Sequence, residues 1–135
     1  MDRCEKLRDN LYSAELFTGS ITPQKEHLAE IFYIVNRTND SEFVKKEALQ
    51  MITQFGKTKY HFCGKHSELW QRIFNDTALK IYPDSEKFLI RTYENTENFA
   101  NELSIALQEK YFVPTDFYLI YDDEEMYRQV LEMLE

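Results

Sequence analysis

Residues 56–66 read G-K-T-K-Y-H-F-C-G-K-H, and this stretch separates two parts of the chain that differ in composition. It holds two of the three glycines, two of the three histidines and one of the two cysteines. Before it, apolar residues recur at helical spacing. From residue 81 onward the chain is richer in aromatic and acidic residues. We therefore expect this stretch to join a helical part to a differently built C-terminal part.

Three segments before this stretch carry apolar residues every three to four positions. This period predicts helices over residues 2–17, 23–35 and 42–55. Gly56 then suits the position after a helix, where a left-handed backbone conformation ends the helix without a Cβ clash. The N-terminal part is therefore expected to be a helical layer.

The sequence from Ser67 onward predicts alternating helices and strands. Ser67 can cap a helix that runs to about Leu79 and contains Trp70, which we expect to be a core residue. Residues 87–93 and 116–122 are rich in strand-forming residues and are separated by a helical pattern around 99–107. A last helix follows Asp122 or Asp123, and residues 58–63 predict a third short strand. Strands joined through a helix are usually parallel with a right-handed crossover.

The expected fold is a single helix-rich α+β domain over residues 1–135. It has an N-terminal helical layer packed on a small C-terminal sheet of two or three strands with helical crossovers. An all-α bundle is the alternative, because short apolar runs fit a strand and a buried helix equally well. With 43% apolar and 30% charged residues, the chain is expected to be globular.

The sequence favours a cytoplasmic setting. No apolar run is long enough to span a membrane, and the first residues lack the apolar core of a signal peptide. Two cysteines far apart do not form a disulfide framework, which indicates a reducing compartment. No glycine follows Gly64, which excludes a glycine-rich dinucleotide loop from the C-terminal part.

His61, Cys63 and His66 form a candidate zinc site within six residues. Imidazole and thiolate are preferred zinc ligands. The spacing H-x-C-x-x-H is not that of a standard zinc finger, and a structural site needs a fourth ligand. Cys4 or His27 would have to supply it. We expect no bound cofactor unless this zinc hypothesis holds.

Cys63 has two further interpretations. Nearby Lys59 and Lys65, with the flanking histidines, would favour a reactive thiolate. An unpaired cysteine, however, usually behaves as a small buried apolar residue. The second interpretation is preferred, with Tyr60 and Phe62 packing on the core beside it.

The negative charge is concentrated in the C-terminal part. Residues 81–135 carry 4 basic and 13 acidic residues, a net charge of −9, whereas residues 1–80 are nearly neutral. Such a surface repels nucleic acid phosphates and attracts a basic protein. The acidic side chains and the tyrosines among them are the candidate partner-binding residues. They are Glu94, Glu97, Glu102, Asp122, Asp123, Glu124, Glu125, Tyr118, Tyr121 and Tyr127.

The favoured function is that of a small, non-enzymatic acidic protein which binds a basic protein through its C-terminal surface. Inhibitors, immunity proteins and antagonists have this size and charge. One alternative is a helical interaction or scaffold module with an apolar groove. The other is a metal-binding or thiol enzyme centred on His61, Cys63 and His66. The acidic residues after the last strand have a structural explanation too, because carboxylates stabilise the first turn of a helix.

Overall fold

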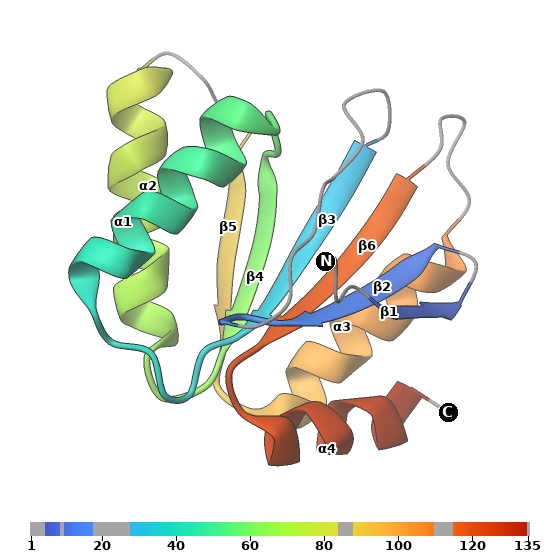
Figure 1. The fold of residues 1–135 in the computed structure, drawn as a ribbon. Helices are drawn as coiled ribbons and strands as arrows, with labels where there is room; N and C mark the ends of the chain where they lie inside the picture. Colours follow the sequence, from blue (N-terminus) through green and yellow to red (C-terminus); the bar gives the residue numbers. More distant parts are fainter. Residues whose placement is uncertain (1–4, 9, 18–27, 84–87, 110–114, 135) are drawn as a thin grey trace.

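The computed structural model describes residues 5–8, 10–17, 28–83, 88–109 and 115–134. They form a six-stranded mixed sheet with helices on both faces (Figure 1). The strands are β1 (Glu5–Arg8), β2 (Leu11–Glu15), β3 (Leu28–Ile34), β4 (Lys59–Cys63), β5 (Leu89–Tyr93) and β6 (Thr115–Tyr121). The helices are α1 (Ser41–Leu49) with its π-helical extension η1 (Gln50–Gln54), α2 (Ser67–Ile81), α3 (Thr96–Gln108) and α4 (Glu124–Leu134).

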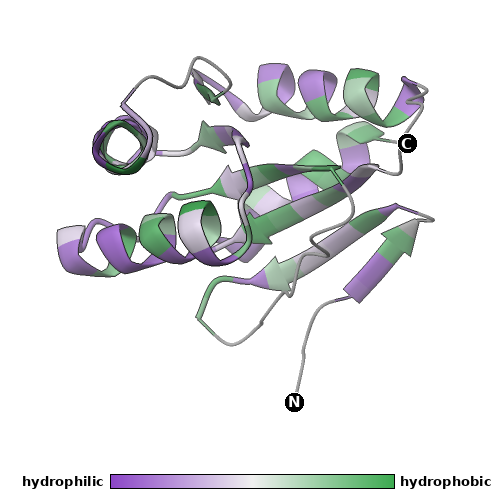
Figure 2. Cartoon of the chain, turned by 90° about the horizontal axis from the view of Figure 1, so that it is seen from above, coloured by the Kyte–Doolittle hydropathy of each residue, from purple (hydrophilic) through white to green (hydrophobic). Residues whose placement is uncertain are grey.

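The strand order across the sheet is β1-β2-β6-β3-β4-β5. Only the β1–β2 pair is antiparallel, and the neighbours from β2 to β5 are all parallel. Helices α1 and α2 pack together on one face, and α3 and α4 pack together on the other. Figure 2 shows the sheet between these two helical layers. The sheet is therefore covered on both faces, as parallel sheets usually are.

The expected small sheet of two or three strands is wrong, and so is the all-α alternative. The segment predicted as a helix over 2–17 contains β1 and β2, and the segment 23–35 contains β3. Residues 28–35, L-A-E-I-F-Y-I-V, are nearly all apolar because both sides of a central parallel strand are buried. A continuous apolar run also satisfies the helical period, which explains the error. Cys4, Thr22, Pro23 and His27 lie outside the described residues.

The remaining helix and strand predictions are confirmed. Asp40 caps α1 by accepting the backbone N–H groups of Glu42 and Phe43, and Gly56 follows η1 with a φ of 64°. Helix α2 begins at Ser67, but the predicted cap is wrong, because the N-cap residue is His66 and no side chain makes a capping hydrogen bond there. Asn95 caps α3. The three predicted strands are β4, β5 and β6, and the helical crossovers join parallel strands.

Each face of the sheet has its own core. On the α1 and α2 side, Trp70 and Phe74 pack against strand aromatics that include Tyr33 and Phe62. The other core lies under α3 and α4 and is built from alternate positions of the same strands. Its fully buried members are Leu11, Phe32, Ile34, Cys63, Phe99, Leu103, Phe117, Leu119 and Val130. Within the described segments, no helix has the length and apolarity needed to cross a membrane.

Candidate functional site

The carboxyl ends of β3 and β6 mark the point where the chain changes face. These strands are neighbours, but β3 leads into α1 on one face and β6 leads into α4 on the other. In open parallel sheets, ligands usually bind in the crevice beyond two such strands. A ligand site is therefore expected at the loops that follow β3, β4 and β6.

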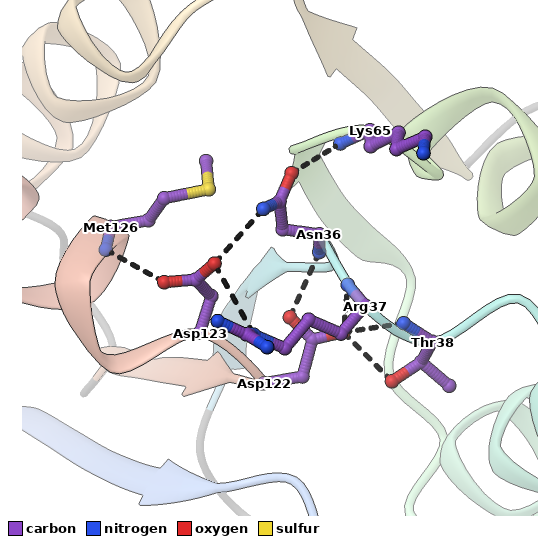
Figure 3. A network of polar contacts seen from close by, with 7 residues as sticks. All are labelled: Asn36, Arg37, Thr38, Lys65, Asp122, Asp123 and Met126. Atoms are coloured by element: carbon purple, nitrogen blue, oxygen red, sulfur yellow. Dashed lines mark hydrogen bonds and ion pairs between the residues drawn. The ribbon is translucent and has the colours of Figure 1, made fainter.

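A network of polar contacts fills this position (Figure 3). Asp122 follows β6, and its Oδ1 accepts the backbone N–H of Asn36 at 2.8 Å. Its Oδ2 accepts the backbone N–H groups of Arg37 and Thr38 at 2.9 and 2.8 Å, and the Thr38 hydroxyl at 2.7 Å. Consecutive N–H groups that converge in this way form an anion-binding nest. In this chain the anion is the carboxylate of Asp122.

Asp123 is bonded within the same network. One oxygen accepts the backbone N–H of Met126 at 3.1 Å and so caps α4, while the other accepts the Asn36 amide at 2.9 Å. The Arg37 guanidinium lies 3.5 Å away. Burial acts to raise the pKa of Asp123, but these hydrogen bonds and the arginine charge outweigh it and hold the pKa below its usual value.

Two further contacts tie the other loops to this network. The Asn36 side-chain oxygen accepts the backbone N–H of Lys65 at 3.0 Å. The Trp70 indole N–H donates to the Thr38 carbonyl at 3.0 Å, which connects α2 to the loop after β3. Among the described residues, no buried side-chain nitrogen or oxygen lacks a hydrogen-bond partner. The network therefore fixes the loops relative to one another, and Asp122 and Asp123 already have partners inside the chain.

The predicted metal ligands do not converge. His61 and Cys63 lie on the same face of β4, under α3 and α4, whereas His66 belongs to the loop before α2. In the part of the chain that the structure describes, no three His, Cys, Asp or Glu side chains come together to hold a metal ion. The zinc hypothesis gains no support from this arrangement, and Cys4 and His27 lie outside the described residues.

His61 and Cys63 have other surroundings. The His61 imidazole is fully buried and bonds to Glu30 through Nε2 at 2.9 Å and to the Tyr93 hydroxyl through Nδ1 at 2.8 Å. Burial, together with the charge of Asp122, raises the pKa of the Cys63 thiol to about 12. A thiol with this pKa is protonated at neutral pH, which is unfavourable for a nucleophile.

The candidate partner-binding residues differ in how far their side chains are exposed to solvent. Glu94, Glu97, Glu124 and Glu125 are exposed. Glu102, Asp122 and Tyr121 are half-buried, and Asp123, Tyr118 and Tyr127 are buried. The exposed carboxylates lie near the N-terminal ends of α3 and α4, and these helices pack on the same face of the sheet (Figure 1).

The three tyrosines support the fold, with Tyr121 and Tyr127 under α3 and α4 and Tyr118 on the other face of the sheet. Tyr118 stacks on Tyr12 on the α1 and α2 side of the sheet, with ring centroids 5.4 Å apart. Tyr121 stacks on Tyr127 at 3.9 Å, and the Tyr127 hydroxyl lies 2.8 Å from the Ser13 hydroxyl. These contacts connect β2, β6 and α4.

Sequence reasoning did not identify Glu30, Tyr93 or the loop Asn36-Arg37-Thr38. One signal was available, because Glu30 is the single charge in the apolar run 28–35. A buried carboxylate requires a polar or charged partner. The identity of the partner of Glu30 could not be read from the sequence, because that partner, His61, is 31 residues away.

Comparisons with protein-family models, curated proteins and solved structures found no match for this chain.

Proposed function

We propose that this protein is a non-enzymatic binding protein that engages a basic protein partner through the outer surface of α3 and α4. One observation carries the proposal: the two helical layers differ in charge. Helices α3 and α4 carry five carboxylates and a single basic residue, Arg128. Helices α1 and α2 carry four acidic and four basic residues. The charge asymmetry along the sequence thus becomes an asymmetry between two faces of the molecule.

The acidic surface, as we use the term, consists of Glu94, Glu97, Glu102, Glu124 and Glu125. Arg128 offsets only part of its charge through an exposed ion pair with Glu124 at 2.9 Å. A surface of one sign steers an oppositely charged protein into productive encounters and so raises the association rate. Asp122 and Asp123 contribute to this field, but their oxygens are bonded inside the chain.

Apolar contacts are needed beside the charges, because exposed ion pairs alone contribute little affinity. Ile105 on α3 and Met133 on α4 are 46% and 45% exposed, so both can contact a partner. We assign them as the apolar contacts of the proposed interface, in place of the buried Tyr118 and Tyr127. Inhibitor, immunity or antagonist activity fits such a surface, and we further infer a cytoplasmic setting from the cysteine content.

The test begins with affinity capture at low and high salt, followed by association kinetics with the captured basic protein. Reversal of Glu124 and Glu125 to lysine should slow association at least about tenfold at low salt, with little change in dissociation. The matched control reverses Glu42 and Glu68, which are exposed on the other helical layer. Equal association rates for the wild type and the Glu124/Glu125 variant would contradict the proposal.

A second candidate function rests on a hollow between α1 and α2. It has a volume of about 390 Å³, and its lining includes Leu49, Ile73 and Ile81, with Lys45 and Lys80 among the polar residues. Leu49 is largely exposed. This hollow favours a helical interaction module that binds a partner through an apolar groove. Binding there should depend weakly on salt, whereas binding at the acidic surface should weaken steeply as salt rises.

The enzyme alternative depends on His61, Cys63 and His66. Elemental analysis of purified, untagged protein tests its metal-dependent form. About one equivalent of zinc, with a melting temperature lowered by a chelator, would restore that hypothesis in spite of the separation of these side chains. We rank it below the two binding functions because the Cys63 thiol is buried and protonated.

A further inference from the structure

The loop after β3 directs four hydrogen-bond donors to one point in the crevice beyond β3 and β6 (Figure 3). They are the backbone N–H groups of Asn36, Arg37 and Thr38 and the hydroxyl of Thr38. Their bonds to the Asp122 carboxylate measure between 2.7 and 2.9 Å, the length expected when the acceptor is charged. Donors that converge in this way suit an oxyanion, which means a carboxylate or a phosphate group.

Contacts that do not involve this carboxylate hold the donors in place. The Val35 N–H donates to the Cys63 carbonyl at 2.8 Å, and the Val35 carbonyl accepts the His66 N–H at 3.0 Å. At the other end of the loop, the Thr38 carbonyl accepts the indole N–H of Trp70 at 3.0 Å. The loop is therefore preorganised by β4 and α2, and its donors should keep their positions when the acceptor changes.

Asp122 is kept at this point by its own backbone. Its N–H donates to the carbonyl of Ile34, the last residue of β3, at 3.1 Å. A carboxylate tethered beside its donors has an effective concentration of at least about 1 mM, so a dilute external anion does not displace it. The Asp122 side chain is half-buried, so solvent can reach the crevice where it lies.

We propose that Asn36, Arg37 and Thr38 form an oxyanion-binding site that the protein keeps closed with its own Asp122 carboxylate. The site lies in the crevice where open parallel sheets usually bind ligands. In the wild type, Asp122 takes the position of the ligand and excludes an external phosphate or carboxylate group. Without the Asp122 carboxylate, the same donors bind an oxyanion from solution. The inference goes beyond the proposed function, because the site does not include the acidic surface and its test needs no partner.

Two charged side chains beside the site influence its affinity. Asp123 accepts the Asn36 side-chain amide at 2.9 Å, and its negative charge opposes the binding of a second anion. The Arg37 guanidinium lies 3.5 Å from Asp123 and offsets part of that charge. We therefore expect free inorganic ions to bind weakly, through the converging donors rather than through a surplus of positive charge.

The test compares three forms of the full chain in phosphate, acetate and chloride buffers of equal ionic strength. Asp122→Ala removes the carboxylate and leaves the donors open. Asp122→Asn is the matched control, because it removes the same charge but still fills the site with a side chain. Amide NMR spectra report binding at residues 36–38. Thermal unfolding reports the stabilisation that a ligand of the native state produces.

In Asp122→Ala, phosphate or acetate should shift the amide signals of Asn36, Arg37 and Thr38 and raise the melting temperature above its value in chloride. Binding should be at least about tenfold tighter than to the wild type or to Asp122→Asn, because in those two forms a tethered side chain occupies the site. The two anions distinguish the sources of the oxyanion, since acetate represents a carboxylate and phosphate represents a phosphate group.

Three results would each overturn the proposal. The first is the absence of amide shifts at residues 36–38 of Asp122→Ala in about 100 mM phosphate and acetate. The second is equal binding by the wild type and Asp122→Ala, which would show that Asp122 does not close the site. The third is equal binding by the two variants, which would attribute the effect to lost charge alone. If Asp122→Ala is unfolded in chloride, recovery of its native spectrum in phosphate or acetate supports the proposal, and failure to recover contradicts it.

Discussion

Asp122 bonds to Thr38 twice, through the backbone N–H at 2.8 Å and through the hydroxyl at 2.7 Å. The two residues are 84 positions apart in the sequence, and they follow the neighbouring strands β6 and β3. The same carboxylate also accepts the N–H groups of Asn36 and Arg37. Asp122 thus occupies the crevice in which open parallel sheets usually bind a ligand.

Asp122→Ala should destabilise the protein by about 1–3 kcal/mol, because it removes the acceptor of three backbone N–H groups and one hydroxyl. Denaturant unfolding measures this change. Glu125→Ala is the matched control at an exposed position three residues further on and should change the free energy of unfolding by less than about 0.5 kcal/mol. Equal effects of the two substitutions would show that the network is not stabilising.

The two described glycines provide a matched pair. Gly64 has a φ of 109°, and a Cβ there would lie 2.8 Å from the Val35 carbonyl carbon, a backbone atom that cannot move aside. Gly56 has a φ of 64°, with open space around the Cβ position. Gly56→Ala should therefore cost about 1–2 kcal/mol, the left-handed penalty alone. Gly64→Ala should cost clearly more because backbone strain and a clash add together. Thermal unfolding of both variants measures the two losses of stability. A smaller loss for Gly64→Ala than for Gly56→Ala would contradict the prediction.

Asp123 should contribute to acid sensitivity. Its pKa in the folded protein lies below the usual aspartate value, because the hydrogen bonds and Arg37 outweigh the effect of burial. The resulting stability is present above the unfolded pKa of about 4 and is lost as pH falls through the lower folded pKa. Asp123→Asn keeps a residue suited to capping α4. Its unfolding free energy should fall less steeply below about pH 4 than that of the wild type. If the unfolding free energies of the two proteins fall in parallel with pH, Asp123 does not contribute to acid sensitivity.

Trp70 is fully buried and donates its indole N–H to the Thr38 carbonyl. Trp70→Ala should cost about 3–5 kcal/mol, the usual range for a large aromatic residue in a core. Trp70→Phe should cost less, because it keeps the aromatic packing and loses the hydrogen bond. Urea unfolding of both variants tests the order, and an alanine variant of wild-type stability would mean that Trp70 is not packed as described.

Cys63 should be unreactive in the native protein. Burial raises the pKa of its thiol to about 12, and only the thiolate attacks alkylating or disulfide reagents. A Cys4→Ser variant leaves Cys63 as the single thiol. Its modification at about pH 8 should be slow in buffer and fast in denaturant. Rapid native modification would revive the interpretation of Cys63 as a nucleophile.

The sequence alone was sufficient where local chemistry decides the structure. Gly56 ends the helical segment through its own left-handed backbone conformation, as its position in the sequence predicts. The same holds for the amphipathic helices α2 and α4, whose apolar residues recur with the helical period. The concentration of negative charge after residue 80 is likewise a property of the sequence, although only the fold places it on one helical layer.

Tertiary structure decided the rest. The apolar run of β3 is a strand because β4 and β6 pair with it and both faces are covered, and neither condition can be read from residues 28–35. Glu30, His61 and Tyr93 meet because strands that are distant in sequence are neighbours in the sheet. Asp122 bonds inside the chain for the same reason. Local propensity acts over one helical turn, whereas strand pairing joins residues at any separation, so the polar networks of this protein exist only once its sheet is assembled.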